Sequence, residues 1–359
     1  MKILLLSYGN IEYDGRLRAL VSVFSEIGDL RAIVHGEKST DSNLIPVNRS
    51  YLPFISKSIR IAKSLGHIDW MVLDNRKATI PGLILLPILK PEIVIQDCRE
   101  LYLLNETKSL PGRIGCIFEK IMARRATVVI CANEERAAIM KKEFGLKTDP
   151  VPYENLRQLQ AESDEEWKKA EERFDNYFGE KALNIISSSG CSIQRTNDIL
   201  IKNLSKINRR CRVFLVGDSD SREEQLIREI ADNNRRDEVV ILGKLNQTEL
   251  KYLIKRCDIG VVNYGQYDTN NKYCASGKLY EFVFEGLPVI TTSNPPLKRL
   301  CDTWGIGEAD DLYYNGINKI SDKYDDYVAS VNSFAEQNTI KDNDRKLIEA
   351  IRERITHKG

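Results

Sequence analysis

Short apolar segments alternate with longer helical patterns along the chain, and this alternation occurs twice. The first series predicts strands at 3–7, 31–35, 71–74, 93–96 and 128–131. After residue 182 the second series predicts strands at 183–187, 211–216, 239–242, 259–263 and 289–292. Helical patterns lie between the strands, for example at 17–27 and 114–126. Strands that alternate with helices are typical of parallel α/β sheets, so the sequence predicts two Rossmann-like domains.

The length of 359 residues fits two domains, because single domains usually hold roughly 100–200 residues. We expect four regions: a first Rossmann-like domain at 1–155, an acidic helical linker at 156–181, a second Rossmann-like domain at 182–320, and a helical segment at 321–359. The linker is expected to form a solvated surface helix, and the last segment is expected to return to the first domain. Parallel sheets bind ligands at the carboxyl ends of their strands, so we expect the two sheets to face each other across a ligand-binding cleft.

The charge balance argues against nucleic acid as a partner. The chain has 53 Lys and Arg against 52 Asp and Glu, although residues 1–150 hold 22 of the former and 17 of the latter. Its eight cysteines form no C-x-x-C pair, which argues against the common zinc sites and a secreted disulfide framework. The opening apolar run is too short for a signal peptide, and no segment is long enough to span a membrane. We expect a cytoplasmic protein.

The segment 270–292 contains the most informative polar residues. Ser276 and Gly277 indicate a helix start, and Lys278, Glu281 and Glu285 would follow on one face of that helix. Backbone N–H groups near Ser276–Leu279, with a lysine beside them, favour phosphate binding, and Glu281 could accept hydrogen bonds from a ribose diol. The alternative is an ordinary amphipathic helix whose Lys and Glu form surface pairs. The residue types alone leave both interpretations open.

The string KLYEF at 278–282, followed by GLPVI at 286–290, resembles the donor-site helix of retaining nucleotide-sugar glycosyltransferases of family 4, which have the GT-B fold. The resemblance implies that Glu281 holds the ribose hydroxyls of the donor. The helix start at Ser276, Gly277 and Leu279 is expected to help bind the donor through its backbone N–H groups. The family motif has a second Glu eight residues earlier, near the transferred sugar. Tyr273 stands at that position here, so it is expected to bind substrate.

Further strings follow the order found in the same family. Asp14-Gly15-Arg16 is similar to its Asp-x-Arg, and Asp97-Cys98-Arg99-Glu100-Leu101 resembles its Asp-x-His-Glu-Leu. The resemblance implies that Gly15, Arg16, Asp97 and Arg99 bind substrate. Glu119 with ATVVICAN at 126–133, VFLVGD at 213–218, VILG at 240–243 and CDIGVV at 257–262 extend the resemblance over nearly the whole chain.

The loop 189–195 resembles the family loop whose basic residues stabilise the leaving diphosphate. Gly190 is expected to bind the donor, and Cys191 stands where relatives carry the first basic residue, so only Arg195 keeps the charge. Departure of a diphosphate needs cationic charge, and Arg offers a two-pronged fork for it. Gly243, Lys244 and Leu245 are expected to read the nucleobase. No metal and no cofactor are expected, because Lys278, Arg195 and the helix start can supply positive potential.

Residues 53–65 form a basic amphipathic pattern with two interpretations. The favoured one is a helix that packs on its own core. The other is peripheral contact with the cytoplasmic face of a membrane.

The sequence therefore predicts a retaining, metal-independent glycosyltransferase that uses a UDP- or GDP-sugar. The acceptor would be a glycan, a lipid-linked molecule or a protein, in cell-surface polysaccharide or glycoconjugate synthesis. A sugar-nucleotide 2-epimerase on the same scaffold and a non-catalytic partner subunit remain as alternatives. A dinucleotide dehydrogenase is disfavoured, because no G-x-G-x-x-G follows either opening strand.

Overall fold

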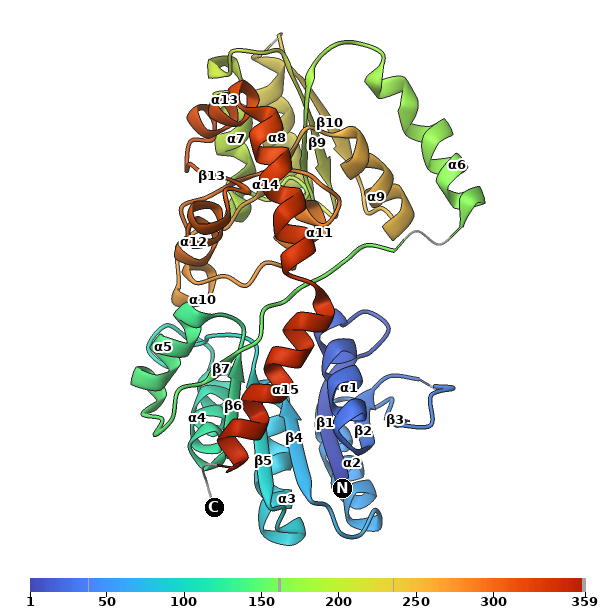
Figure 1. Cartoon of the computed structure of the whole chain (residues 1–359), viewed down its shortest axis with the longest axis vertical. Coiled ribbons are helices and arrows are strands. Elements are labelled where there is room, and N and C mark those ends of the chain that lie inside the picture. Colours follow the sequence, from blue (N-terminus) through green and yellow to red (C-terminus); the bar gives the residue numbers. More distant parts are fainter. Residues whose placement is uncertain (38, 161–162, 235, 357–359) are drawn as a thin grey trace. The chain divides into compact units, whose positions relative to one another are not determined.

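The computed structural model describes residues 1–37, 39–160, 163–234 and 236–356. The chain divides into two compact units (Figure 1). The first unit consists of residues 1–155 together with the C-terminal residues from 340 onward, and the second unit consists of residues 156–339.

The first unit is built on a seven-stranded parallel sheet with the order β3-β2-β1-β4-β5-β6-β7. Its central strands are continuous apolar runs, because helices cover both faces of the sheet. The strands are β1 (Lys2–Asn10), β2 (Asp29–His35), β3 (Leu44–Pro46), β4 (Trp70–Asp74), β5 (Ile93–Cys98), β6 (Val128–Cys131) and β7 (Val151–Pro152).

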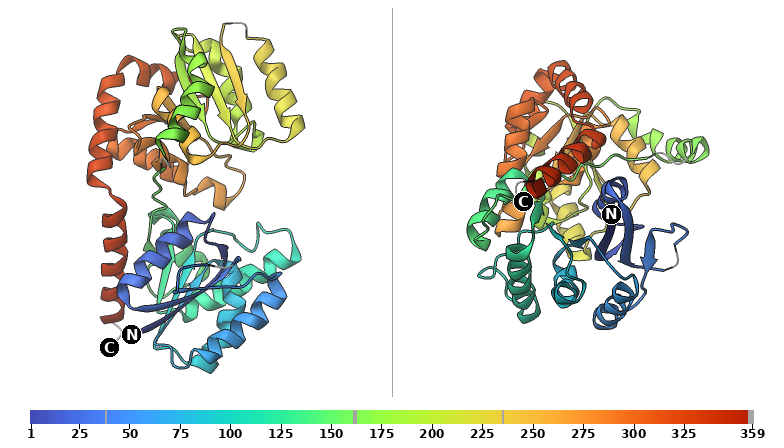
Figure 2. Two further views of the ribbon diagram at one scale, coloured as in Figure 1. Left: turned by 90° about the vertical axis from the view of Figure 1, so that its right-hand side faces the viewer. Right: turned by 60° about the horizontal axis from the view of Figure 1, so that its bottom comes forward.

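Alternate residues of β1 face two different cores. Ile3 and Leu5 pack toward α1 and α15, whereas Leu4 and Leu6 pack toward α2 and α3. Figure 2 shows α1 and α15 on one side of these strands and α2 on the other. The helices of this unit are α1 (Gly15–Ile27), α2 (Tyr51–Ser64), α3 (Thr79–Leu89), α4 (Leu110–Arg125), α5 (Glu134–Phe144) and α15 (Ile340–Thr356).

The second unit has a six-stranded parallel sheet with the order β10-β9-β8-β11-β12-β13. Its strands are β8 (Leu183–Ser187), β9 (Cys211–Val216), β10 (Glu238–Leu242), β11 (Ile259–Val262), β12 (Val289–Thr291) and β13 (Gly307–Ala309). Its α-helices are α6 (Asp164–Phe174), α7 (Asn197–Asn203), α8 (Ser221–Asp232), α9 (Gln247–Arg256), α10 (Thr269–Lys272), α11 (Gly277–Val283), α12 (Pro295–Trp304), α13 (Tyr314–Asp322) and α14 (Tyr324–Gln337).

Two predicted segments differ in detail from the structure. The acidic helix α6 is not fully solvated, because Ala170 and Phe174 are buried and the Trp167 ring lies 5.3 Å from that of Tyr252. The C-terminal segment is shared between the units: α14 packs in the second unit, and α15 packs in the first through Leu347 and Ile351. Residues 161–162 of the acidic segment and 357–359 of the C-terminal segment lie outside the described residues.

The basic helix predicted at 53–65 is α2, and its apolar face packs in the core. Phe54, Ile55 and Ala62 are buried, and Ile59 packs against them. Within the described ranges, no helix is both long and apolar enough to cross a membrane.

Candidate donor site

The candidate site of the second unit lies at the carboxyl ends of β8 and β11. These strands are neighbours at the centre of the sheet, where the order of the chain reverses. Open α/β sheets bind ligands at such a switch point, because the loops after the two strands diverge there. The loop 188–195 follows β8, Asn263 and Tyr264 follow β11, and α11 begins nearby with Lys278 in its first turn.

Gly190 allows the loop after β8 to pack closely against the loop after β9. Its φ is +60°, and a Cβ at this position would lie 2.5 Å from the carbonyl oxygen of Asp218. Its N–H donates to the carbonyl oxygen of Val216 at 2.8 Å. Only glycine fits this conformation and this close approach. Gly190 therefore shapes the loop.

Lys278 lies partly buried in α11, and its Nζ donates to the backbone carbonyl of Ser188. The pKa of Lys278 is lowered to about 8, first by burial and then by the positive charge of Arg195, whereas the charge of Glu281 acts in the opposite direction. Burial disfavours the charged form of a lysine, and so does a second cation nearby. Lys278 and Arg195 are thus brought close enough to repel each other, as expected for two groups that bind one anion.

Arg195 is held by an aromatic ring and a backbone carbonyl. Its guanidinium carbon lies 3.7 Å from the centroid of the Tyr264 ring, and Nη1 donates to the carbonyl of Asn263 at 3.5 Å. A stacked guanidinium keeps its charge and its planar set of donors. Tyr264 was not predicted for this role, although its position immediately beyond a predicted strand was a usable signal.

Neither cation has a carboxylate partner. Among the described residues, no Asp or Glu oxygen lies within 4.0 Å of the charged nitrogens of Lys278 or Arg195. A buried cation without a carboxylate is costly, and the fall in the pKa of Lys278 reflects that cost. The site therefore keeps positive charge available for a ligand.

Glu281 lies one turn after Lys278 and is partly buried. Burial raises its pKa, while the charges of Arg157 and Lys278 lower it. Glu285 does not share this face, because α11 ends at Val283 rather than at Gly286. The Glu285 carboxylate instead lies 2.9 Å from Lys251 Nζ and 3.2 Å from Lys255 Nζ.

The other predicted donor-binding residues lie in different surroundings. Leu279 is fully buried in the core, so only its backbone is near the site, and Ser276 is also buried. Tyr273 ends α10 and is partly buried. Gly243 and Lys244 follow β10 and are exposed, and Leu245 is partly buried there.

Cys191 points away from the site. Its side chain is fully buried among Leu200, Leu215 and other core residues, while its N–H donates to Ser219 Oγ at 2.9 Å. This position therefore supplies no charge to the candidate site.

A small polar network behind the loop was missed by sequence analysis. Asn197 Nδ2 donates to the Gly190 carbonyl at 2.7 Å and to Ser189 Oγ at 3.1 Å. Asn263 Nδ2 donates to Asn197 Oδ1 at 2.8 Å, which links the loop after β8 to the end of β11. Short polar residues directly after two central strands were the available signal. This network fixes the loop that carries Arg195.

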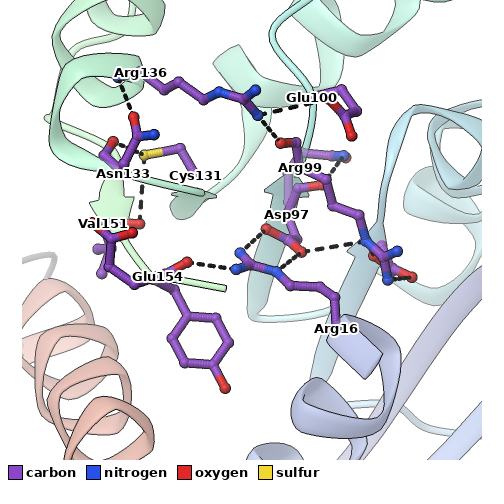
Figure 3. A network of polar contacts seen from close by, with 12 residues as sticks. Arg16, Asp97, Arg99, Glu100, Cys131, Asn133, Arg136, Val151 and Glu154 are labelled. Carbon is purple, nitrogen blue, oxygen red and sulfur yellow. Dashed lines mark hydrogen bonds and ion pairs between the residues drawn. The ribbon is translucent and has the colours of Figure 1, made fainter. Parts of the chain in front are cut away.

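The first unit carries its own polar network at the carboxyl ends of β1, β4 and β5 (Figure 3). Arg16 Nε donates to Asp97 Oδ2 at 3.0 Å, and Nη2 donates to Oδ1 at 2.7 Å. Arg16 Nη1 donates to the carbonyl of Tyr153 at 2.5 Å. Arg136 Nη1 donates to the carbonyl of Arg99.

Arg99 is held by two other carboxylates. Its Nε and Nη2 donate to the two oxygens of Asp74 at 2.6 and 2.8 Å, and Nη1 donates to Asp14 Oδ2 at 2.5 Å. Asp14 also caps α1 by accepting from the Leu17 N–H at 3.0 Å. Burial raises the pKa of Asp74, and the charge of Arg99 lowers it.

These contacts change the interpretation of the predicted substrate-binding residues of this unit. Arg16 is 5% exposed and Asp97 is fully buried, and each is the ion-pair partner of the other. Their side chains hold the loops after β1 and β5 rather than facing solvent. Arg99 is also largely buried, and Gly15 is the first residue of α1.

Comparisons with known proteins concern the fold. The sequence matches no protein-family model and no curated protein. Among solved structures, Anabaena HepE in complex with UDP and glucose has a TM-score of 0.68 at 17% identity, covering 98% of this chain and 100% of that one. The chain has the GT-B fold.

Two further structures are similar over almost their whole length. Sucrose-phosphate synthase from Thermosynechococcus elongatus has a TM-score of 0.62 at 14% identity, covering 100% of this chain and 98% of that one. UDP-GlcNAc 2-epimerase from Neisseria meningitidis bound to UDP-GlcNAc has a TM-score of 0.58 at 11% identity, with coverages of 97% and 100%. The prediction of two Rossmann-like domains is confirmed.

Proposed function

We propose that the chain is a retaining glycosyltransferase of the family-4 type that uses a UDP- or GDP-linked sugar. The observation that carries this proposal is the pair Lys278 and Arg195 at the carboxyl edge of the second sheet, neither matched by a carboxylate. Two converging cations fit the diphosphate of a nucleotide sugar. The similarity to HepE bound to UDP and glucose supports this choice of ligand.

In this proposal the donor lies along the carboxyl edge of the second unit. Lys278 and Arg195 bind the diphosphate, and Glu281 accepts hydrogen bonds from the ribose hydroxyls. The exposed backbone of Gly243–Leu245 contacts the base, and Tyr273 lies beside the sugar.

The proposed chemistry is a substitution on one face of the sugar. The bond from the anomeric carbon to the diphosphate oxygen breaks, and the acceptor oxygen bonds to the same face of that carbon. The acceptor proton passes to a phosphate oxygen. Negative charge on the leaving oxygen grows as the bond breaks, so preorganised cations stabilise the transition state more than the bound donor. The reaction then needs neither a metal ion nor a cofactor.

The acceptor is a separate part of the proposal. We propose a glycan, a lipid-linked molecule or a protein as acceptor, in the synthesis of a cell-surface polysaccharide or glycoconjugate in the cytoplasm. The buried network of Arg16, Asp97 and Arg99 would then act by positioning the loops of the first unit.

A sugar-nucleotide 2-epimerase is the second candidate, and the likeness to UDP-GlcNAc 2-epimerase favours it. Both candidates need the diphosphate site, but only the epimerase changes the sugar without an acceptor. A non-catalytic partner subunit would show no turnover by itself.

The test is a panel of UDP- and GDP-sugars incubated with the purified chain and followed by NMR. The transferase predicts binding and slow donor hydrolysis, in which the anomeric configuration of the released sugar is kept at first. The epimerase predicts a new sugar nucleotide instead. The variant Lys278→Met serves as the control, because it removes the cation and keeps the length of the side chain. Failure of every donor to bind would contradict both enzymatic assignments.

A further inference from the structure

Helix α4 of the first unit carries an apolar stripe on its outer side. Leu110, Ile114 and Ile117 follow a spacing of four and three residues, and they are 70%, 42% and 45% exposed. That spacing places them on one face of a helix. The opposite face of α4 is buried through Cys116, Glu119, Met122 and Ala123.

Helix α3 beside it is apolar and contains no charged residue. It packs against both α2 and α4, and it leaves Ile84 and Ile88 each 43% exposed. A helix that is apolar all round is normally buried in protein or in a membrane. The side of α3 that faces away from the core is therefore apolar and partly exposed, and no charged residue of α3 lies on it.

The charges on these three helices have one sign. Helices α2, α3 and α4 together contain seven Lys and Arg but only one acidic residue, Glu119, which is 1% exposed. The cations belong to α2 and α4, on either side of the apolar α3: Lys57, Arg60, Lys63, Arg113, Lys120, Arg124 and Arg125. An apolar centre between basic helices thus forms one surface, which we call the α2–α4 face.

A groove extends this surface beside α4. It has a volume of about 530 Å³, and Leu104, Ile117 and Phe144 line it together with Arg113 and Lys120. The α2–α4 face and this groove, with Leu52 and Tyr102 at their borders, hold a large share of the exposed large apolar side chains of the chain. Contiguous exposed apolar patches of this kind mark interaction surfaces.

We propose that the α2–α4 face binds the surface of an anionic membrane. The apolar side chains of α3 and α4 enter the boundary between headgroups and acyl chains, and the lysines and arginines lie over lipid phosphates. Charge complementarity selects this occupant: an anionic surface attracts each Lys and Arg, and the helices α2, α3 and α4 expose no carboxylate against it. The exposed Glu143 of α5 lines the adjoining groove, where Arg113, Lys120 and Arg124 outnumber it. This proposal differs from membrane contact through the apolar side of α2. That side is buried in the core, so α2 contributes only its cations.

The experiment measures binding of the full chain to vesicles by co-sedimentation. Vesicles of phosphatidylcholine with phosphatidylglycerol are compared with vesicles of phosphatidylcholine alone, at low and high salt. We expect binding to the anionic vesicles that weakens with salt. The double substitution Arg113→Gln with Lys120→Gln should weaken it by roughly 10- to 30-fold, and Ile114→Ser with Ile117→Ser should weaken it by a similar factor.

Matched controls lie on other faces. Lys346→Gln with Arg352→Gln removes two exposed cations from α15, which covers the opposite side of the same sheet, and Leu226→Ser removes an exposed apolar residue of the second unit. These controls should bind vesicles like the parent chain, and every variant should keep the parent melting temperature. The proposal is overturned if the chain does not bind anionic vesicles, or if the α4 variants bind these vesicles as well as the controls do. It is also overturned if the α4 substitutions abolish self-association of the chain in light scattering and leave vesicle binding intact, since the face would then bind a second copy.

Discussion

Both units place cations at the carboxyl edge of their sheets, but they surround them differently. In the first unit Arg16 pairs with Asp97, and Arg99 pairs with Asp74 and Asp14, so each guanidinium meets a carboxylate. In the second unit Lys278 and Arg195 meet a backbone carbonyl and an aromatic ring. A cation paired with a carboxylate stabilises the structure, whereas a cation without a carboxylate leaves positive electrostatic potential that an anionic ligand can use. The same edge is therefore structural in one unit and, in our proposal, a binding site in the other.

The largest expected effect comes from breaking a matched pair. Arg16→Met removes both hydrogen bonds of the buried Asp97 carboxylate to Arg16 and leaves it only the Arg99 guanidinium, whose Nε lies 3.9 Å away, which should lower the free energy of unfolding of the first unit by about 3–5 kcal/mol. Urea denaturation followed by calorimetry measures this loss. The matched comparison is Lys278→Met in the second unit, which should cost little or nothing. Equal losses of unfolding free energy in Arg16→Met and Lys278→Met would contradict the proposed difference between the units.

The next effect is on the rate of transfer. Arg195→Ala and Lys278→Ala should each lower kcat by on the order of 10²–10³, because each removes an electrostatic donor to the leaving diphosphate. Both groups serve the same oxygens, so the double variant should lose less than the product of the two single losses. Lys298→Ala, a surface lysine paired with Asp302, is the control and should leave kcat unchanged. A rise in KM with intact kcat would make both side chains simple binders.

A smaller effect is expected at Glu281. Replacement by Gln removes a charge-assisted hydrogen bond to the ribose, which should weaken donor binding by about 10- to 100-fold. Calorimetric titration with the donor nucleotide and with its 2′-deoxy form separates this contact from others. The parent chain should lose affinity for the deoxy nucleotide, and Glu281→Gln should bind both forms equally weakly. A Glu281→Gln variant that still prefers the ribose form would place the ribose elsewhere.

The smallest expected effect is a pH dependence. Lys278 carries its charge below its pKa of about 8, so kcat/KM for the donor should fall as pH rises through that value. Lys278→Arg should remove this fall, because arginine stays charged throughout the range. Rate profiles between roughly pH 6 and 9.5 measure it. A parent profile that is flat above pH 8 would show that Lys278 does not hold the diphosphate as a cation.

Sequence patterns predicted the regular parts of both units. The strands at Val128–Cys131, Leu183–Ser187 and Cys211–Val216 have the predicted bounds, because buried parallel strands are short and mostly apolar segments. The strands β3, β7 and β13, of two or three residues each, were missed, because segments this short carry no periodic signal; β12 is as short, but it was predicted from the longer apolar run that contains it. Their pairing depends on neighbours that are distant in the chain.

The candidate site shows the same limit at the level of side chains. Sequence patterns predicted that Lys278, Glu281 and Arg195 lie at one sheet edge, because the ends of strands and the starts of helices can be recognised from residue types. It could not show that Arg16 meets Asp97, 81 positions away, or that Cys191 turns into the core. Whether a cation is matched depends on which side chains the fold brings within hydrogen-bond distance.

One measurement tests the central claim, that the unmatched cations of the second unit are kept for a diphosphate. The melting temperatures of the parent chain and of Lys278→Met are compared with and without UDP and GDP. We predict that Lys278→Met melts at the same or a higher temperature when empty, since a costly buried cation is gone. We also predict that a nucleotide raises the melting temperature of the parent and not of the variant. A variant that is less stable when empty, yet is stabilised by the nucleotide as much as the parent, would contradict the account.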